Sequence, residues 1–115
     1  MLSPMIPLHG DAGRDQAEQL IVGAQPAWIF KHSATCSISA AALEQVTAHL
    51  AAQPAPAAMV VVQDDRPVSN WLAQRLGYAH QSPQLFLVRG GKVLWQASHW
   101  GITAAAMAQA REKAR

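Results

Sequence analysis

The chain has 115 residues, of which 50% are apolar, so its length suits one compact domain with one hydrophobic core, over residues 1–115. The formal charge is only +2 and the basic residues are scattered apart from a weakly basic tail, so nucleic acid is not an expected partner. The first ten residues lack the basic start and apolar core of a secretory signal, and no apolar run is long enough to cross a bilayer. We therefore expect a cytoplasmic protein without a membrane partner.

The first half of the chain predicts two buried strands joined by a helix. Residues 27–30 and 59–62 are apolar runs rich in β-branched or aromatic side chains, which are typical of central strands. Between them, apolar residues recur at spacings of three and four within residues 39–50, and this pattern predicts an amphipathic helix. Nearer the N-terminus, we expect a short edge strand at residues 5–8 and another helix at residues 14–22.

The second half predicts a helix, a hairpin and a closing helix. The helix carries Pro67 in its first turn and ends at Gly77, where a glycine C-cap is expected. Residues 85–88 and 93–95 have strand composition, and the glycine pair between them predicts a tight hairpin. Thr103 is the expected N-cap of the closing helix.

The predicted order of elements is β-α-β-α-β-α-β-β-α. Strands that alternate with helices favour right-handed parallel crossovers, and the terminal hairpin adds an antiparallel edge. We therefore predict an α/β protein with a mixed β-sheet, a C-terminal antiparallel hairpin and helices on both faces. This is the topology of the thioredoxin-like fold.

Cys36 is the only cysteine, so no intramolecular disulfide is possible. A lone cysteine is more often a small buried residue of the core than a reactive thiol. This one, however, lies between a predicted strand and the first turn of a predicted helix. The N-terminus of a helix favours a thiolate and lowers the pKa of such cysteines. We predict that Cys36 is a partly exposed nucleophile. Lys31 and His32 lie on opposite faces of the strand, so at most one of them can add positive charge beside the sulfur.

Two further features accompany the cysteine. Ser39 stands three residues after Cys36, where a dithiol enzyme carries its second cysteine. Its hydroxyl can hydrogen-bond a thiolate or serve only in the capping region of the helix, and both interpretations stay open. Ser82 and Pro83 come just before the predicted strand at residues 85–88. A Ser-Pro bond alone is weak evidence for a cis bond, but in thioredoxin-like folds a cis-proline packs against the active cysteine at this place. By that likeness of topology we predict a cis bond between Ser82 and Pro83, with Pro83 packed against Cys36 and the Ser82 backbone pairing with an extended substrate.

Several motifs carry a family resemblance. They are Phe30-Lys31-His32-Ser33, Thr35-Cys36, Val68-Ser69, His80-Gln81-Ser82-Pro83-Gln84 and the run from Trp95 to Thr103. In this order they resemble the YtxJ-like monothiol bacilliredoxins over about residues 28–103. The resemblance implies a thioredoxin-like fold and removal of bacillithiol, a low-molecular-weight thiol, from S-thiolated client proteins, with Cys36 as the catalytic cysteine.

Around Cys36 we predict a set of substrate-binding residues. They are Lys31, His32, Thr35, Ser37, Ser39, Ser82 and Pro83. Ser37 departs from the family pattern, which usually has a proline directly after the cysteine, and this departure bears on the rate more than on the chemistry. We expect no tightly bound cofactor, because the small thiol acts as a co-substrate.

Other functions stay open at this stage. A similar Cys-x-x-Ser motif in monothiol glutaredoxins carries an iron-sulfur cluster, and a redox-inert binding or stress module is a further alternative. A metal site built from Cys36, His32, His80 and His99 is disfavoured, because zinc ligands usually show closer paired spacings. The sequence does not distinguish bacillithiol from glutathione, and it leaves the oligomeric state open.

Overall fold

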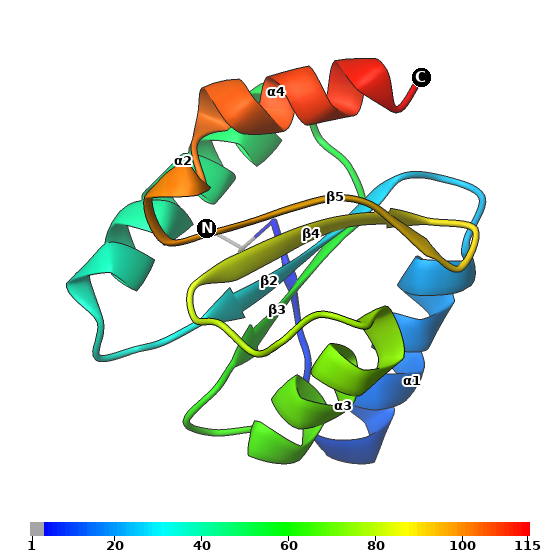
Figure 1. The fold of residues 1–115 in the computed structure, drawn as a ribbon, viewed down its shortest axis with the longest axis vertical. Coiled ribbons are helices and arrows are strands. Elements are labelled where there is room, and N and C mark those ends of the chain that lie inside the picture. The colour runs from blue at the N-terminus through cyan, green and yellow to red at the C-terminus, as the bar shows by residue number, and fades with distance from the viewer. Residues whose placement is uncertain (1–3) are drawn as a thin grey trace.

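The strands form one mixed sheet in the computed structural model, which describes residues 4–115 (Figure 1). The strands are β1 (Ile6–Pro7), β2 (Ala27–His32), β3 (Ala57–Val61), β4 (Gln84–Arg89) and β5 (Lys92–Ser98), in the order β1-β3-β2-β4-β5. β1 and β2 run parallel to β3, whereas β4 is antiparallel to β2, and β5 to β4. The predicted mixed sheet is confirmed. The antiparallel part includes the β2–β4 pair as well as the β4–β5 hairpin, because residues 77–83 return the chain to the carboxyl end of β2.

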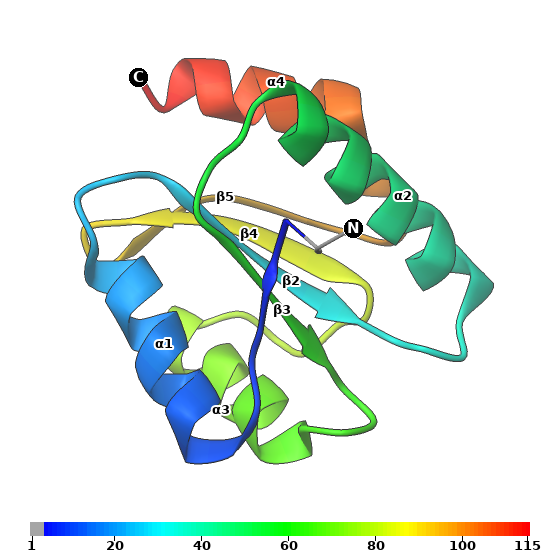
Figure 2. The ribbon, with the colours of Figure 1, turned by 180° about the vertical axis from the view of Figure 1, so that it is seen from behind.

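Helices cover both faces of this sheet. α1 (Gly10–Val22) and α3 (Arg66–Leu76) lie on one face, and α2 (Ser37–Ala52) and α4 (Ala104–Lys113) lie on the other (Figure 2). A 3-10 helix, η1 (His99–Gly101), connects β5 to α4 and has no counterpart in the sequence prediction. No helix among the described residues is long and apolar enough to cross a bilayer.

Alternation along β2 divides the apolar core between the two faces. Trp28 and Phe30 are buried against α2 and α4, whereas Ile29 is buried against α1 and α3. This is the two-residue period of a strand that is covered on both sides. The same alternation places Lys31 on the α3 side and His32 on the α2 side, so the predicted separation of these two side chains is confirmed.

The local signals read from the sequence lie where the elements end. Thr103 Oγ1 accepts the Ala106 N–H at 3.0 Å and caps α4. Gly77 ends α3 with φ 77°, a left-handed conformation that glycine adopts without strain. Gly90 and Gly91, with φ 60° and 84°, form the turn between β4 and β5.

The two central strands bring two loops together. Lys31, near the end of β2, pairs with Gln84 at the start of β4. The segment that follows β2 and the segment that precedes β4 therefore meet at one edge of the sheet. Cys36 belongs to the first of these segments and Pro83 to the second.

Candidate active site

Cys36 is the N-cap residue of α2, with φ −109° and ψ 124°. Its N–H donates to the Ser33 carbonyl at 3.3 Å, and its carbonyl accepts the Ala40 N–H at 3.0 Å. The thiol is free and half-buried, and it makes no capping hydrogen bond. The predicted position, a partly exposed sulfur at the N-terminus of the helix, is therefore confirmed. The helix is 16 residues long, and its positive end begins directly after the cysteine.

Ser39 is turned inward beneath this loop. Its hydroxyl accepts the Ser33 N–H at 2.9 Å, and a 2.7 Å hydrogen bond joins it to His32 Nδ1. Ser39 is fully buried. Of the two interpretations that the sequence left open, the geometry favours a structural role in the first turn of α2. Burial lowers the pKa of His32, so its imidazole is neutral at neutral pH.

Gln63 holds the same loop from the turn that follows the neighbouring strand β3. Its Nε2 donates to Ser33 Oγ at 2.7 Å and to Thr35 Oγ1 at 3.3 Å, and its Oε1 accepts the Ala34 N–H at 3.1 Å. Gln63 is absent from the residues predicted for the site. A signal was available, since a polar residue just after β3 must lie beside the end of the parallel strand β2.

Pro83 lies in the loop that precedes β4. The Ser82–Pro83 peptide bond is cis, as the sequence predicts. Pro83 is buried, and its carbonyl accepts the His99 N–H at 3.1 Å, which ties η1 to this loop. Register extrapolated from the Lys31–Gln84 pair sets Pro83 opposite His32. Packing of Pro83 directly against the Cys36 sulfur stays a prediction.

Lys31 differs most from its predicted role. It is fully buried on the α3 side of β2, and its Nζ has no hydrogen-bond partner among the described residues. Lysine is almost never fully buried unless it is paired. The prediction that Lys31 binds substrate directly is corrected, because a fully buried side chain does not reach a substrate at the surface. Burial lowers the pKa of Lys31 to about 8.

The remaining predicted site residues lie at the surface. Thr35 is exposed and accepts from Gln63, and Ser37 is exposed at the first position of α2. Ser82 is half-buried at the cis bond. In residues 4–115, no group of three or more His, Cys, Asp or Glu side chains is arranged to hold a metal ion.

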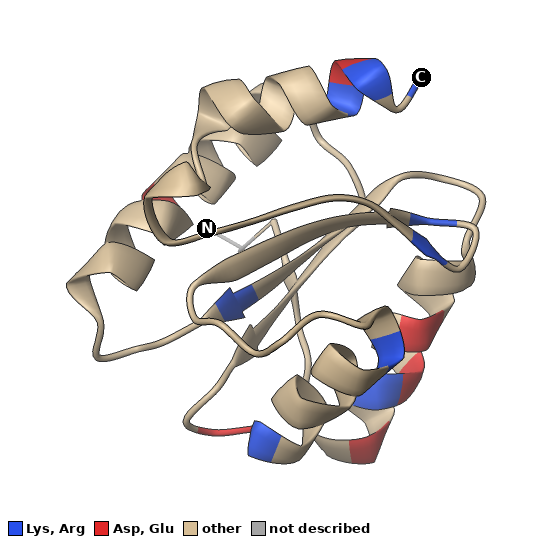
Figure 3. Cartoon of the chain, viewed as in Figure 1, with Lys and Arg blue, Asp and Glu red and all other residues tan. Residues whose placement is uncertain are grey.

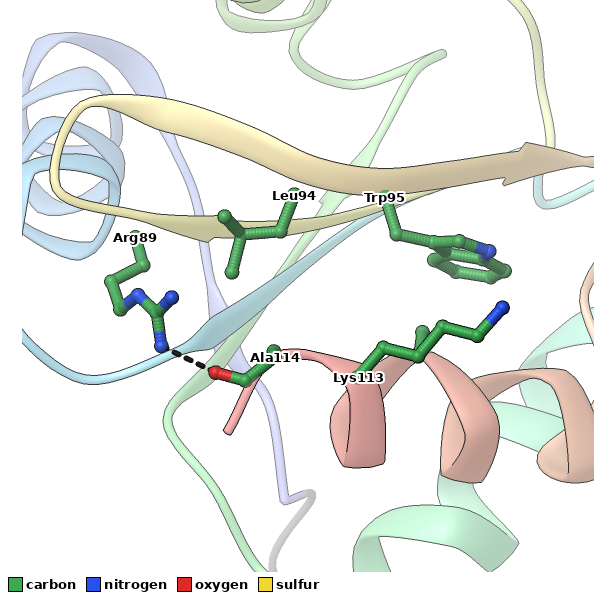
Figure 4. Close-up of a pocket in the computed structure, with 6 residues that line it drawn as sticks. Arg89, Leu94, Trp95, Lys113 and Ala114 are labelled. Atoms are coloured by element: carbon green, nitrogen blue, oxygen red, sulfur yellow. Dashed lines mark hydrogen bonds between the residues drawn. The ribbon is translucent and has the colours of Figure 1, made fainter.

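Few charges lie on the helix that begins at Cys36, and one pocket lies at the opposite end of the sheet. α2 carries a single acidic residue, Glu44, and no lysine or arginine (Figure 3). At the far end of the sheet, a pocket lies between the β4–β5 hairpin and α4 (Figure 4). Its Arg89 already donates to the Ala114 carbonyl at 2.6 Å. That pocket is remote from Cys36, because Arg89 ends β4 whereas Gln84, beside the cysteine loop, begins it.

The fold and the single cysteine at a helix N-terminus define a thioredoxin-fold protein with one thiol. One solved structure, described as a candidate oxidoreductase with a thioredoxin fold, has a TM-score of 0.84 and 33% identity over 92% of each chain. Thioredoxin from Fasciola hepatica has a TM-score of 0.75 and 15% identity, over 96% of this chain and 100% of that one, and supports the fold alone. The family model described as "Monothiol bacilliredoxin BrxC" matches residues 13–107. The chain therefore belongs to the monothiol bacilliredoxin BrxC family.

Proposed function

We propose that this protein is a thiol-disulfide oxidoreductase that removes a low-molecular-weight thiol, bacillithiol, from S-thiolated client proteins through Cys36. The observation that carries the proposal is the free, half-buried thiol at the N-terminus of α2 in a chain with one cysteine. Family membership supports thiol oxidoreductase chemistry. The YtxJ-like resemblance supports bacillithiol as the thiol.

The proposed reaction needs only one protein sulfur. The Cys36 thiolate attacks the small-thiol sulfur of the client's mixed disulfide, so that the Cys36–thiol bond forms and the client thiolate leaves. A second small thiol then attacks the adduct and regenerates Cys36, with release of a symmetric small-molecule disulfide. No tightly bound cofactor takes part. We propose a cytoplasmic location for this activity, because small thiols keep the cytoplasm reducing and can regenerate Cys36 there.

Backbone groups at the cis-proline loop provide a way to hold the client. The Pro83 carbonyl is occupied by the His99 N–H. Ser82 is half-buried beside it and belongs to no strand, so we propose that its N–H and C=O pair with an extended client segment. Recognition through the backbone would let one protein act on clients of many sequences.

Intact-mass measurement tests the proposal directly. The protein is incubated with bacillithiol disulfide and, separately, with glutathione disulfide, and the mass of the adduct identifies the thiol. We expect a bacillithiol adduct that forms faster than the glutathione adduct and is absent from Cys36→Ser. The variant should keep the thermal stability of the parent, because the thiol makes no capping bond.

Three results would contradict the proposal in different ways. Faster loading by glutathione would replace bacillithiol as the thiol but keep the chemistry. The absence of any adduct on a folded protein would favour the redox-inert module. Unfolding of Cys36→Ser would assign the cysteine a structural role.

A further inference from the structure

The buried amine of Lys31 is the polar group that the proposed reaction leaves unexplained. Its side chain is fully buried, and its Nζ has no hydrogen-bond partner among the described residues. Burying an ammonium group without a partner is costly, so a fully buried lysine without a partner is rare. Lys31 lies in β2, where it is followed by His32 at the end of the strand.

Lys31 shares the α3 side of β2 with two other nitrogen-bearing side chains, those of Arg66 and His80. His80 is exposed, and its Nδ1 lies 3.4 Å from Ser69 Oγ on the first turns of α3. Partial desolvation lowers the pKa of His80, and the positive charges of Lys31 and Arg66 lower it further. Arg66 is exposed at the first position of α3 and forms no ion pair within residues 4–115. Two positive charges and an imidazole therefore converge beside the N-terminus of α3.

The N-terminus of α3 lacks the side-chain cap that its sequence offers. Asp65 is the N-cap residue, but its side chain makes no capping bond. Its carboxylate instead accepts hydrogen bonds from His9 at 2.9 Å and from the Gly10 N–H at 3.1 Å. Asp64 is the remaining acidic residue in this turn, and it is exposed. The positive end of α3 thus adds to the two basic side chains.

Gln63 places this basic cluster next to the cysteine loop. Its side chain contacts Ser33, Ala34 and Thr35, the three residues that precede Cys36. Arg66 is three residues further along the chain, a span of at most about 11 Å when fully extended. The start of α3 therefore follows, within this short span, the side chain that holds the cysteine loop.

We propose that Arg66, His80 and the buried charge of Lys31 form an anion subsite that binds a carboxylate of the small thiol carried on Cys36. This inference rests on the proposed function and specifies the class of its co-substrate, an anionic thiol. Arg66 and His80 contact the carboxylate, and Lys31 acts from beneath as a positioning residue. In the loading step, the Cys36 thiolate attacks a disulfide R–S–S–R, the Cys36–S–R bond forms, and R–S⁻ leaves and takes a proton from water.

Three small symmetric disulfides that differ in charge test the subsite. They are 3,3′-dithiodipropionate, bis(2-hydroxyethyl) disulfide and cystamine, which are anionic, neutral and cationic. The rate of adduct formation on Cys36 is followed by intact mass, and each rate is divided by that of N-acetylcysteine with the same reagent. We expect the wild-type protein to prefer the anionic over the neutral disulfide by about five- to tenfold at low salt, and less in 0.5 M NaCl.

Variants separate the subsite from the thiol chemistry. Arg66→Gln, at an exposed position, and Lys31→Met, of similar shape, should each lower the ratio of the anionic to the neutral rate. Lys92→Gln, at the hairpin on the opposite end of the sheet, should keep the full preference. An unchanged preference in both Arg66→Gln and Lys31→Met overturns the subsite and leaves the proposed function intact. A wild-type protein that forms no adduct with any of the three reagents overturns both.

Discussion

Replacement of Ser39 by alanine should destabilise the protein through one specific backbone group. The Ser39 hydroxyl accepts the Ser33 N–H at 2.9 Å, and Ser33 and Ser39 are both buried. Without this hydroxyl the N–H has no acceptor, which costs about 1–3 kcal/mol. His32 is only partly buried, so water can replace the bond at its Nδ1. Alanine is the better helix former by roughly 0.5 kcal/mol, so the middle of that range, about 2 kcal/mol, leaves a net loss of about 1–2 kcal/mol.

The loss is large enough to measure by thermal unfolding. The entropy of unfolding is about 2.1 cal/mol/K per residue, so a chain of this length loses roughly 4–8 °C in Tm. Ser37→Ala is the matched control, because Ser37 lies in the same helical turn and is exposed. Its Tm should stay within about 2 °C of the parent. Equal melting temperatures for Ser39→Ala and Ser37→Ala would refute the assignment of Ser39 as the internal acceptor.

Three other predictions concern the same edge of the sheet. Gln63→Ala should loosen the cysteine loop at a cost of about 1 kcal/mol and speed hydrogen exchange at the Ala34 amide, and unchanged exchange by NMR argues against the contact. Ser39→Cys should form an internal disulfide with Cys36 and expel a bound small thiol, so an adduct that lasts as long as in the parent contradicts their shared turn. Burial lowers the pKa of Lys31 from 10.5 to about 8, so between these values the unfolded chain binds more protons than the folded one. The free energy of unfolding of the wild type should therefore rise with pH across this window relative to Lys31→Met, by up to about 3 kcal/mol, and parallel pH profiles in denaturant titrations contradict this.

Most elements of the fold are predictable because their signals are local. Residues 27–30 form an apolar run that is long enough to predict a strand. Glycine indicates a position that needs a left-handed backbone, as at Gly77. The threonine before α4 has its cap partner only three residues away. η1 has no such signal, since it spans three residues and includes His99 at a positive φ of 53°. The direction of β4 also depends on where a long loop returns, which composition does not encode.

The candidate site is predictable only where its chemistry is local. The position of Cys36 follows from a strand followed by a helix. The hydrogen-bond partners of Ser39 do not follow from the sequence, because the spacing of a helical turn is the same whether the hydroxyl faces a thiolate or the loop behind it. Local spacing does not predict Gln63 as a site residue, because its contacts lie 28 to 30 residues away in the sequence. Only the parallel pairing of β2 with β3 indicates them. Full burial of Lys31 is unexpected because strand alternation specifies a face but not whether other elements cover it.

The bonds from Gln63 also set when the cysteine loop acquires its shape during folding. Three consecutive residues before Cys36 depend on a side chain that is synthesised after β3, and β3 must first pair with β2. A nascent chain that has emerged only as far as α2 therefore lacks the side chain that makes these bonds. A peptide cut from residues 30–39 would lack the same support. The arrangement around the sulfur is a property of the assembled sheet and cannot be transplanted with the motif.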